Sequence, residues 1–424
     1  MDKQKLGDIA TVEISGVDKK TKDGEQEIRL CNFVDVYYNW AITTAQHDGF
    51  MFATARPNEI SKFQLKKGQV ALTKDSETRD DIGVPTYIAD DFDDVILGYH
   101  CALITPNKDI LDGRYLNALL HTDYAKKYFA CNASGSGQRY ALSVEALNSF
   151  PVPMIPLRNQ ERIGEIFSAL DKKIELNRRI NQNLEAMAKQ LYDYWFVQFD
   201  FPNKDGKPYK SSGGKMVWND KLKREIPIDW HCGNLFEIAV FTNGLACQKF
   251  RPKDDEAPLP VIKIREMHDG ISADTEEVTP NIPESVKVYN GDVLFSWSAS
   301  LEVILWAYGL GGLNQHIFKV TSANDFPKSF YYFQLLDYVD IFKKMAEARK
   351  TTMGHITQDH LQQSTIAIPD NKDIADKFEE LISPIFRQMI KLQEEILNLT
   401  KQRNELLPLL MNGQVSVNSD LSLG

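Results

Sequence analysis

Two polar segments of the sequence, 134–140 and 349–355, combine glycine, hydroxyl and cationic side chains. Each lies just before a predicted helix, which starts at Ser143 or at Thr357. Glycine lets a backbone approach a ligand, and the free N–H groups at a helix start favour phosphate, so such loops suit a nucleic-acid backbone. The candidate contacts are Ser134, Ser136, Gln138, Arg139 and Tyr140 in the first loop, and Arg349, Lys350, Thr351, Thr352 and His355 in the second.

The same loops could also distinguish bases. Gln138 and Arg139 carry the donors and acceptors that match the adenine and guanine edges of the major groove. An ordinary polar turn before a helix cap is the alternative for each loop alone, but recurrence at matching points favours a shared function. A second, weaker pair follows two strands that begin Gly-Gln-Val and Gly-Asp-Val. Its candidate contacts are Lys74 in the first copy, and Ser296 and Ser298 in the second.

Motifs for catalysis are missing from the sequence. It has no G-x-G-x-x-G before a helix, no G-x-x-x-x-G-K-[ST], no H-E-x-x-H and no Asn/Asp-Pro-Pro signature of amino-methyltransferases. His355 and His360 are five residues apart, off one helical face, and Cys131 has no nearby histidine in the sequence. The acidic run 90–94 fits a solvated loop better than a cation site. We therefore predict a chain without a catalytic, cofactor or metal site.

The elements that would position the polar loops come in two copies. Three segments recur in the same order, with offsets of 229, 223 and 214 residues: 6–10 at 235–239, 67–73 at 290–296, and 142–147 at 356–361. Each copy mixes short strand-like runs with helical stretches, and Gly, Pro, Asn and Asp separate the runs. We therefore predict two α+β globular domains in tandem.

A long helix is predicted after each domain. Past the proline-rich segment 151–156 and past Pro369, apolar residues recur at spacings of three and four, the pattern of a coiled-coil seam. Pro384 and Pro408 are expected to kink or shorten the second helix. Neither helix buries its apolar stripe alone, so we expect the two to pack on each other. An antiparallel pairing would give pseudo-two-fold symmetry, with one domain at each end.

Six segments follow from these patterns. They are a first domain 1–156, a central spacer helix 157–199, a polar linker 200–229, a second domain 230–369, a C-terminal spacer helix 370–412 and a flexible tail 413–424.

Composition says more about the cellular environment expected for the protein than about its function. The 424 residues include 59 Asp+Glu and 49 Lys+Arg, a formal net charge of −10, which argues against a basic nucleic-acid tail but leaves local patches open. Five scattered cysteines without a C-x-x-C pair predict reduced thiols and no zinc site. No apolar run reaches the roughly 18 residues of a membrane span, and no secretory signal opens the sequence, so we expect a cytoplasmic protein.

Several longer stretches extend the repeat plan into a family resemblance. They are Pro-Val-Pro-Met-Ile-Pro-Leu at 151–157, Gln-Glu-Arg-Ile at 160–163, Leu-Asp-Lys-Lys-Ile-Glu-Leu-Asn at 170–177, Gly-Lys-Pro-Tyr-Lys-Ser-Ser-Gly-Gly at 206–214, Arg-Glu-Ile-Pro at 224–227 and Leu-Asn-Gln-His at 313–316. Over nearly its whole length the chain resembles the specificity subunits of Type I restriction-modification systems. The second copy departs from the family's proline-rich helix entry, keeping only Pro369 there.

The resemblance implies two target recognition domains, each reading one half of a split sequence in double-stranded DNA. It also implies that the two helices set the gap and bind two modification (methyltransferase) subunits, with restriction subunits joining the full complex. S-adenosylmethionine, ATP and Mg would then belong to the partner subunits. Two other functions stay open on the residues alone: a diverged nuclease or methyltransferase, and a coiled-coil scaffold without a sequence-specific DNA role.

Overall fold

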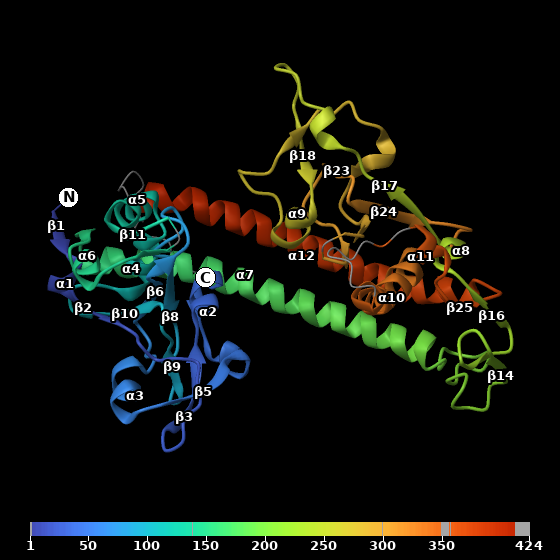
Figure 1. Ribbon diagram of the computed structural model, residues 1–424, viewed down its shortest axis with the longest axis horizontal. Helices are drawn as coiled ribbons and strands as arrows, with labels where there is room; N and C mark the ends of the chain where they lie inside the picture. Colours follow the sequence, from blue (N-terminus) through green and yellow to red (C-terminus); the bar gives the residue numbers. More distant parts are fainter. Residues whose placement is uncertain (1, 138, 299, 349–355, 357, 412–424) are drawn as a thin grey trace. The chain divides into compact units, whose positions relative to one another are not determined.

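The computed structural model describes residues 2–137, 139–298, 300–348, 356 and 358–411 (Figure 1). The chain divides into two compact units. Unit 1 comprises Met1–Glu175 with Leu399–Gly424, and unit 2 comprises Leu176–Asn398. Each unit mixes helices with short strands, and two long helices, α7 (Leu157–Tyr192) and α12 (Asp373–Met411), contribute to both.

Unit 1 contains a five-stranded sheet in the order β2-β10-β6-β8-β4 and a three-stranded sheet in the order β5-β3-β9 (Figure 1). The strands of these sheets are β2 (Ala10–Ile14), β3 (Gln26–Cys31), β4 (Ala41–Ile42), β5 (Met51–Ala55), β6 (Val70–Thr73), β8 (Pro85–Ile88), β9 (Val95–Leu97) and β10 (Cys101–Pro106). Smaller ladders use β1 (Lys3–Lys5), β7 (Asp75–Ser76), β11 (Ser134–Ser136), β12 (Arg139–Ala141) and β13 (Pro151–Pro153). The helices are α1 (Leu6–Ile9), α2 (Phe33–Tyr38), η1 (Thr44–Gly49), α3 (Pro57–Phe63), α4 (Gly113–Leu120), α5 (Asp123–Asn132) and α6 (Val144–Asn148).

Unit 2 contains two four-stranded sheets, in the orders β17-β24-β21-β22 and β19-β18-β23-β20. Their strands are β17 (Ala239–Asn243), β18 (Leu259–Ile262), β19 (Glu277–Val278), β20 (Lys287–Val288), β21 (Val293–Ser296), β22 (Glu302–Leu305), β23 (Gly311–Leu313) and β24 (Ile317–Ser322). Two further ladders pair β14 (Met216–Asn219) with β15 (Arg224–Pro227), and β16 (Trp230–Gly233) with β25 (Ile366–Pro369). The helices are η2 (Asp193–Val197), α8 (Leu235–Ile238), η3 (Cys247–Lys249), α9 (Ile264–Asp269), η4 (Glu284–Val286), α10 (Lys328–Ala348) and α11 (Gln358–Gln362).

The repeat predicted from the sequence is confirmed by the strand order. In unit 1, β10 pairs on one side with β2 and on the other with β6, both antiparallel. In unit 2, β24 pairs in the same way with β17 and β21. The strand that leads into each domain also pairs with the strand that leaves it, as β1 with β13 and β16 with β25. The predicted α+β class with two similar domains and two long helices is therefore confirmed.

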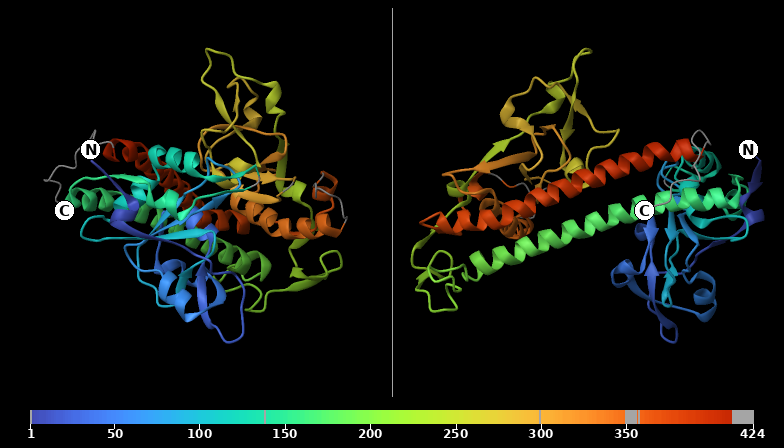
Figure 2. Two further views of the ribbon diagram at one scale, coloured as in Figure 1. Left: turned by 60° about the vertical axis from the view of Figure 1, so that its left-hand side comes forward. Right: turned by 180° about the vertical axis from the view of Figure 1, so that it is seen from behind.

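The long helices pack antiparallel within each unit. In unit 1, Phe167 of α7 shares a buried cluster with Leu407 of α12, and the Arg403 guanidinium lies 3.7 Å from the Asp171 carboxylate. In unit 2, the Asn181 amide donates to the Met389 carbonyl at 3.2 Å. As residue numbers increase along α7, those of the contacting residues on α12 decrease, which is the antiparallel packing that the apolar stripes predict. In Figure 2, α7 is drawn in green and α12 in red.

One detail differs from the predictions, and a second adds to them. The helix α12 runs through Pro384 and Pro408 without ending, although each proline removes one backbone hydrogen bond. Both prolines lie on the exposed side, so the buried stripe opposite them stays intact and holds the helix together. The segment 200–229, predicted as a linker, forms the β14–β15 hairpin, and Phe201 stacks on Trp230 at a centroid distance of 5.7 Å. The domain boundaries predicted from the sequence remain a prediction. The two compact units divide the chain within α7 and within α12, and not at the predicted boundaries.

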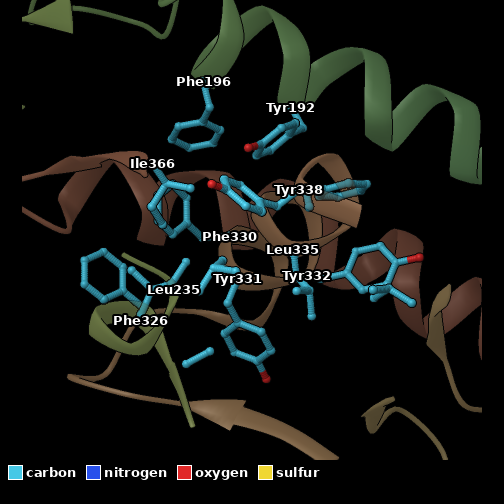
Figure 3. Packing of buried hydrophobic residues seen from close by; sticks show 14 of the residues in the cluster. Tyr192, Phe196, Leu235, Phe326, Phe330, Tyr331, Tyr332, Leu335, Tyr338 and Ile366 are labelled. Carbon is cyan, nitrogen blue, oxygen red and sulfur yellow. The ribbon is translucent and has the colours of Figure 1, made fainter. Parts of the chain in front are cut away.

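Aromatic side chains dominate the core of unit 2 (Figure 3). Phe330 and Phe333 of α10 are fully buried, and the Phe333 ring stacks on Tyr192 of α7 at 5.2 Å. Phe196 of η2 meets Phe330 edge to face at 5.0 Å. Removing a buried phenylalanine from such a core costs about 3–5 kcal/mol, so the end of α7 is firmly bound to this domain.

Candidate nucleic-acid interface

One surface of unit 1 unites two motifs that the sequence placed far apart. The strand β6 ends at Thr73, and β7 begins two residues later at Asp75. The polar loop that follows α5 folds into the β11–β12 hairpin, and β12 pairs with β7 in the register Ala141↔Asp75. The loop residue Arg139 and the strand-end residue Lys74 therefore come together on one edge.

Asp75 is the centre of this surface. Its carboxylate accepts from the Lys74 ammonium at 2.7 Å and pairs with Nδ1 of His100. The Arg139 guanidinium lies 3.3 Å from the same carboxylate, and its N–H donates to Nε2 of His100 at 3.0 Å. We call Lys74, Asp75, His100 and Arg139 the Asp75 cluster. It combines two permanent cations with one carboxylate.

Burial separates the roles within the Asp75 cluster. The Asp75 side chain is 10% exposed, whereas the Arg139 side chain is 59% exposed. Burial opposes ionisation of Asp75, but hydrogen bonds with Lys74 and His100 outweigh it and hold the pKa of the carboxyl below its usual value. The ionised Asp75 thus orients Arg139 from beneath, while the guanidinium keeps donors free for a ligand at the surface.

A hollow of about 570 Å³ adjoins the Asp75 cluster and adds aromatic surface. Its lining includes Val34, Tyr37 and Tyr38 of α2, and the Tyr38 side chain is 74% exposed. Tyr37 donates to the Asp81 carboxylate at 2.9 Å, and burial together with this carboxylate raises the pKa of Tyr37 to about 12. Glu77 and Asp81 also line the hollow, so the feature that suits a nucleic acid is the Arg139 guanidinium beside exposed aromatic rings, which can meet phosphate and base faces.

Unit 2 has the same framework at the corresponding place. In unit 1, the Lys74 N–H donates to the His100 carbonyl at 2.9 Å, and the Leu142 N–H donates to the Lys74 carbonyl at 2.8 Å. In unit 2, the Trp297 N–H donates to the His316 carbonyl at 3.3 Å, and the Ile356 N–H donates to the Trp297 carbonyl at 2.9 Å. Trp297 therefore corresponds to Lys74, His316 to His100, and Ile356 to Leu142.

The side chains on this second framework carry no permanent charge. The Trp297 indole N–H donates to Oδ1 of Asn243 at 3.3 Å, and the Trp297 and His316 rings lie 5.5 Å apart. The Gln315 amide nitrogen lies 3.3 Å from Nε2 of His316. We call Asn243, Trp297, Gln315 and His316 the Trp297 cluster. It offers amide, imidazole and indole groups in place of the cations of unit 1.

The predicted contact residues are placed as follows. Lys74 and Arg139 belong to the Asp75 cluster, and the Tyr140 ring lies beneath the Arg79 guanidinium at 5.0 Å. Ser134 and Ser136 lie in β11, where the Ser134 hydroxyl donates to the Ala141 carbonyl at 3.2 Å. Six predicted contacts lie outside the described residues: Gln138, Arg349, Lys350, Thr351, Thr352 and His355.

Ser296 is a correction to the predicted set. Its side chain is fully buried, and its hydroxyl donates to the Ser300 carbonyl and accepts from the Glu302 N–H, which closes the turn between β21 and β22. A hydroxyl used in this way has no surface to offer a ligand. Ser298 is also buried, so the exposed chemistry of this turn belongs to their neighbour Trp297.

Sequence reasoning missed His100, His316, Gln315 and Asn243. His100 and His316 are 216 residues apart, which fits the decrease of the repeat offset from 223 before them to 214 after them. The sequence could therefore have identified them as corresponding residues. The pairing of Gln315 with His316 was visible only as part of a family-like stretch. Within the parts of the chain that are described, no group of three metal-ligating side chains occurs, and no helix is long and apolar enough to cross a membrane.

Comparison with known proteins identifies similar chains. The family described as the Type I restriction modification DNA specificity domain matches residues 1–186 and 227–401. The MjaIX Type I restriction enzyme specificity subunit of Methanocaldococcus jannaschii is 25% identical over 319 residues, which cover 73% of this chain and 71% of that protein. The HindI specificity subunit of Haemophilus influenzae is 24% identical over 413 residues, which cover 84% of this chain and 88% of that protein.

A solved structure has a similar fold. The S subunit of a Type I restriction-modification system from M. genitalium superimposes with a TM-score of 0.56 at 11% sequence identity, covering 96% of this chain and 95% of that chain. At this identity the likeness concerns the fold. It agrees with the tandem α+β arrangement and the long helices described above.

Proposed function

The chain belongs to the family of Type I restriction-modification DNA specificity proteins, and from this premise we propose how its two halves divide the work. The domain in unit 1 reads one half of a bipartite sequence in double-stranded DNA, and the domain in unit 2 reads the other half. The long helices set the gap between the half-sites. The chain itself catalyses no reaction, and it directs partner subunits to their target.

One observation carries this proposal: the two units build the same backbone framework and cover it with different side chains. The Asp75 cluster and the Trp297 cluster correspond through matched backbone hydrogen bonds. Direct readout of DNA uses hydrogen bonds and apolar contacts from side chains to base edges, so two frameworks with different side chains suit two different half-sites. A nuclease or methyltransferase would instead need a reacting centre, which these clusters do not resemble.

Exposed apolar residues on the long helices support docking of the modification subunits. Leu176 and Met187 of α7 are 53% and 58% exposed, and Leu381 of α12 is 49% exposed. Leu176 and Met187 are eleven residues apart, about three helical turns, so they lie on the same side of α7. Apolar side chains presented in this way favour a protein partner. We propose that two modification subunits bind the helices and that restriction subunits join the full complex.

The cofactors of the reaction belong to the partners in this proposal. S-adenosylmethionine would bind the modification subunits, and ATP and Mg would bind the restriction subunits. Loss of this chain would then leave the enzymes without a target, although their own active sites would be complete.

The test is a map of methylated bases across the genome, made with and without the gene for this chain. We expect one bipartite motif, two short half-sites with a fixed gap, to lose methylation when the gene is deleted and to regain it on complementation. A methylation pattern that is unchanged by deletion would overturn the proposal. Purified protein incubated alone with DNA, S-adenosylmethionine and a divalent metal should produce neither methylated nor cleaved DNA.

A further inference from the structure

We infer that Gln315 reads an adenine in the half-site bound by unit 2 and that His316 orients its amide. This inference rests on the proposed function and assigns one of its specificity-determining residues. Its starting point is the Trp297 cluster, which occupies in unit 2 the place that the Asp75 cluster occupies in unit 1.

Three strand ends bring the Trp297 cluster to one edge of a sheet. Asn243 ends β17, Trp297 follows β21, and His316 immediately precedes β24. Since β24 lies between β17 and β21 and pairs antiparallel with both, these ends are neighbours. The Ile356 N–H donates to the Trp297 carbonyl at 2.9 Å, so Ile356 also lies beside these strand ends.

The backbone beneath Gln315 is held in place by loop-to-loop bonds. The Gln315 N–H donates to the Leu245 carbonyl at 2.8 Å, and the Leu245 N–H donates to the Leu313 carbonyl at 2.8 Å. The approach is so close that a Cβ on Gly244 would lie 2.2 Å from the Asn314 carbonyl oxygen. A residue on such a fixed backbone presents its side chain in a reproducible direction, which base readout needs.

The Gln315 amide is oriented and still has capacity for a ligand. Its Nε2 lies 3.3 Å from Nε2 of His316, so with the imidazole proton on Nδ1 the amide donates one of its two hydrogens to the ring. Oε1 of Gln315 accepts no hydrogen bond from the described residues of the chain. The second amide N–H and Oε1 therefore suit a ligand that carries a hydrogen-bond acceptor next to a hydrogen-bond donor. Adenine does so through N7 and N6 in the major groove.

The corresponding place in unit 1 explains why the two halves should differ. Tyr99 and His100 occupy the positions of Gln315 and His316, at the same offset of 216 residues. There Nε2 of His100 accepts from Arg139, whereas Nε2 of His316 lies next to the Gln315 amide. An imidazole thus orients a guanidinium in unit 1 and an amide in unit 2, and these groups match guanine and adenine respectively.

The experiment selects bound duplexes from a library that is randomised across both half-sites. The full chain is purified together with its modification subunits, and the variants Gln315→Ala, Gln315→Glu and Gln315→Met are compared with the wild type. Gln315→Ala and Gln315→Met should reduce the preference for adenine at one position of one half-site by about 5- to 100-fold. Gln315→Glu can only accept, so preference there should move toward cytosine, whose N4 donates.

The controls separate this inference from the proposed function. Gln388→Ala removes an exposed amide from α12 in the same unit and should leave the selected sequence unchanged. Melting temperature and subunit content show whether each variant is folded and assembled. If wild type selects a sequence and all three Gln315 variants keep the same base preference, the inference is wrong and the proposed function stands. If wild type selects no sequence at all, both fail.

Discussion

The Asp75 cluster and the Trp297 cluster occupy corresponding places in the two units, yet they carry opposite kinds of chemistry. In unit 1, Lys74 and Arg139 surround a buried carboxylate. In unit 2, Trp297 and Gln315 surround an imidazole without any permanent charge. The same four backbone groups donate and accept in both places. The comparison shows that matched backbone hydrogen bonds hold the two clusters at corresponding places, while the side chains on them differ.

This separation has a physical basis. Backbone bonds between strand ends are independent of side-chain identity, so a framework persists when exposed residues on it change. Buried side chains lack that freedom, because each contacts several neighbours at high packing density. In the proposed function, new specificity can therefore arise at an exposed position such as Arg139 without repacking the domain.

The strongest test of the comparison exchanges one whole unit-1 domain. Replacing residues 1–156 with the matching segment of a relative should change one half of the methylated motif and leave the other half and the gap intact. Methylation mapping of cells that carry the chimera measures this result. A chimera that changes both halves, or neither, would contradict the division of labour between the two domains.

A change in the helices should alter the gap without altering either half-site. Adding four residues in phase with the apolar seam, for example after Leu184 in α7, lengthens the helix by about 6 Å and rotates its distal part by about 40°. Base pairs are about 3.4 Å apart, so the gap should grow by one or two base pairs. Methylation mapping again gives the readout. An unchanged gap in an active, assembled complex would mean that contacts with partner subunits set the spacing.

Single substitutions in the Asp75 cluster test whether its charge reads a base or holds phosphate. If Arg139 reads a guanine, Arg139→Ala should lower discrimination at that base by about 1–3 kcal/mol. If it binds phosphate only, affinity should fall equally for all sequences, and the slope of log K against log salt should decrease by about one.

Asp75→Asn serves as the companion variant for Arg139→Ala. It removes the carboxylate that lies 3.3 Å from the Arg139 guanidinium and orients it. The variant should weaken base discrimination less than loss of Arg139 itself. Titrations of the assembled complex at several salt concentrations distinguish the outcomes. Wild-type affinity and specificity in both variants would remove the Asp75 cluster from the reading surface. Lys350→Ala tests the second loop in the same assay.

The smallest expected effect is an opposite response of two histidines to acid. Burial lowers the pKa of His121 in unit 1 to about 3. The unfolded state then binds more protons below pH 6.5, so stability falls as pH decreases from 6.5, by about 1.4 kcal/mol per pH unit at most. In unit 2, burial opposes protonation of His231, but hydrogen bonds with Asp370 and Glu237 outweigh it and raise its pKa. Its stabilising contribution is present below pH 6.5 and is lost as pH rises through the raised value.

Thermal unfolding between pH 5 and 8 measures this contrast. His121→Gln should reduce the loss of stability that acidification causes in the wild type. His231→Gln should remove the stabilising contribution that the protonated His231 makes at low pH. The same sign of change in both variants would contradict the assignment of a neutral His121 and a protonated, carboxylate-bound His231.

The sequence by itself determined the features that depend on local pattern. Spacings of three and four predicted both long helices, because a helix repeats every 3.6 residues. Short runs between turn residues predicted the α+β domains, and the shrinking offsets predicted the repeat that the strand order confirms. Lys74 and Arg139 could also be named as candidate contacts from the sequence, because each lies in a short polar segment next to a predicted strand or helix.

Only the tertiary structure decided which of these residues meet. Lys74, His100 and Arg139 lie on separate segments, and they converge because β10 pairs with β6 and β12 pairs with β7. Ser296 matched the expected pattern, yet pairing of β21 with β22 buries its hydroxyl in a turn. Strand pairing joins residues that are far apart in sequence, and its register depends on the packing of a whole face and not on any local run. The fold therefore decides which residues meet in the proposed reading surface, whereas the sequence supplies the candidates.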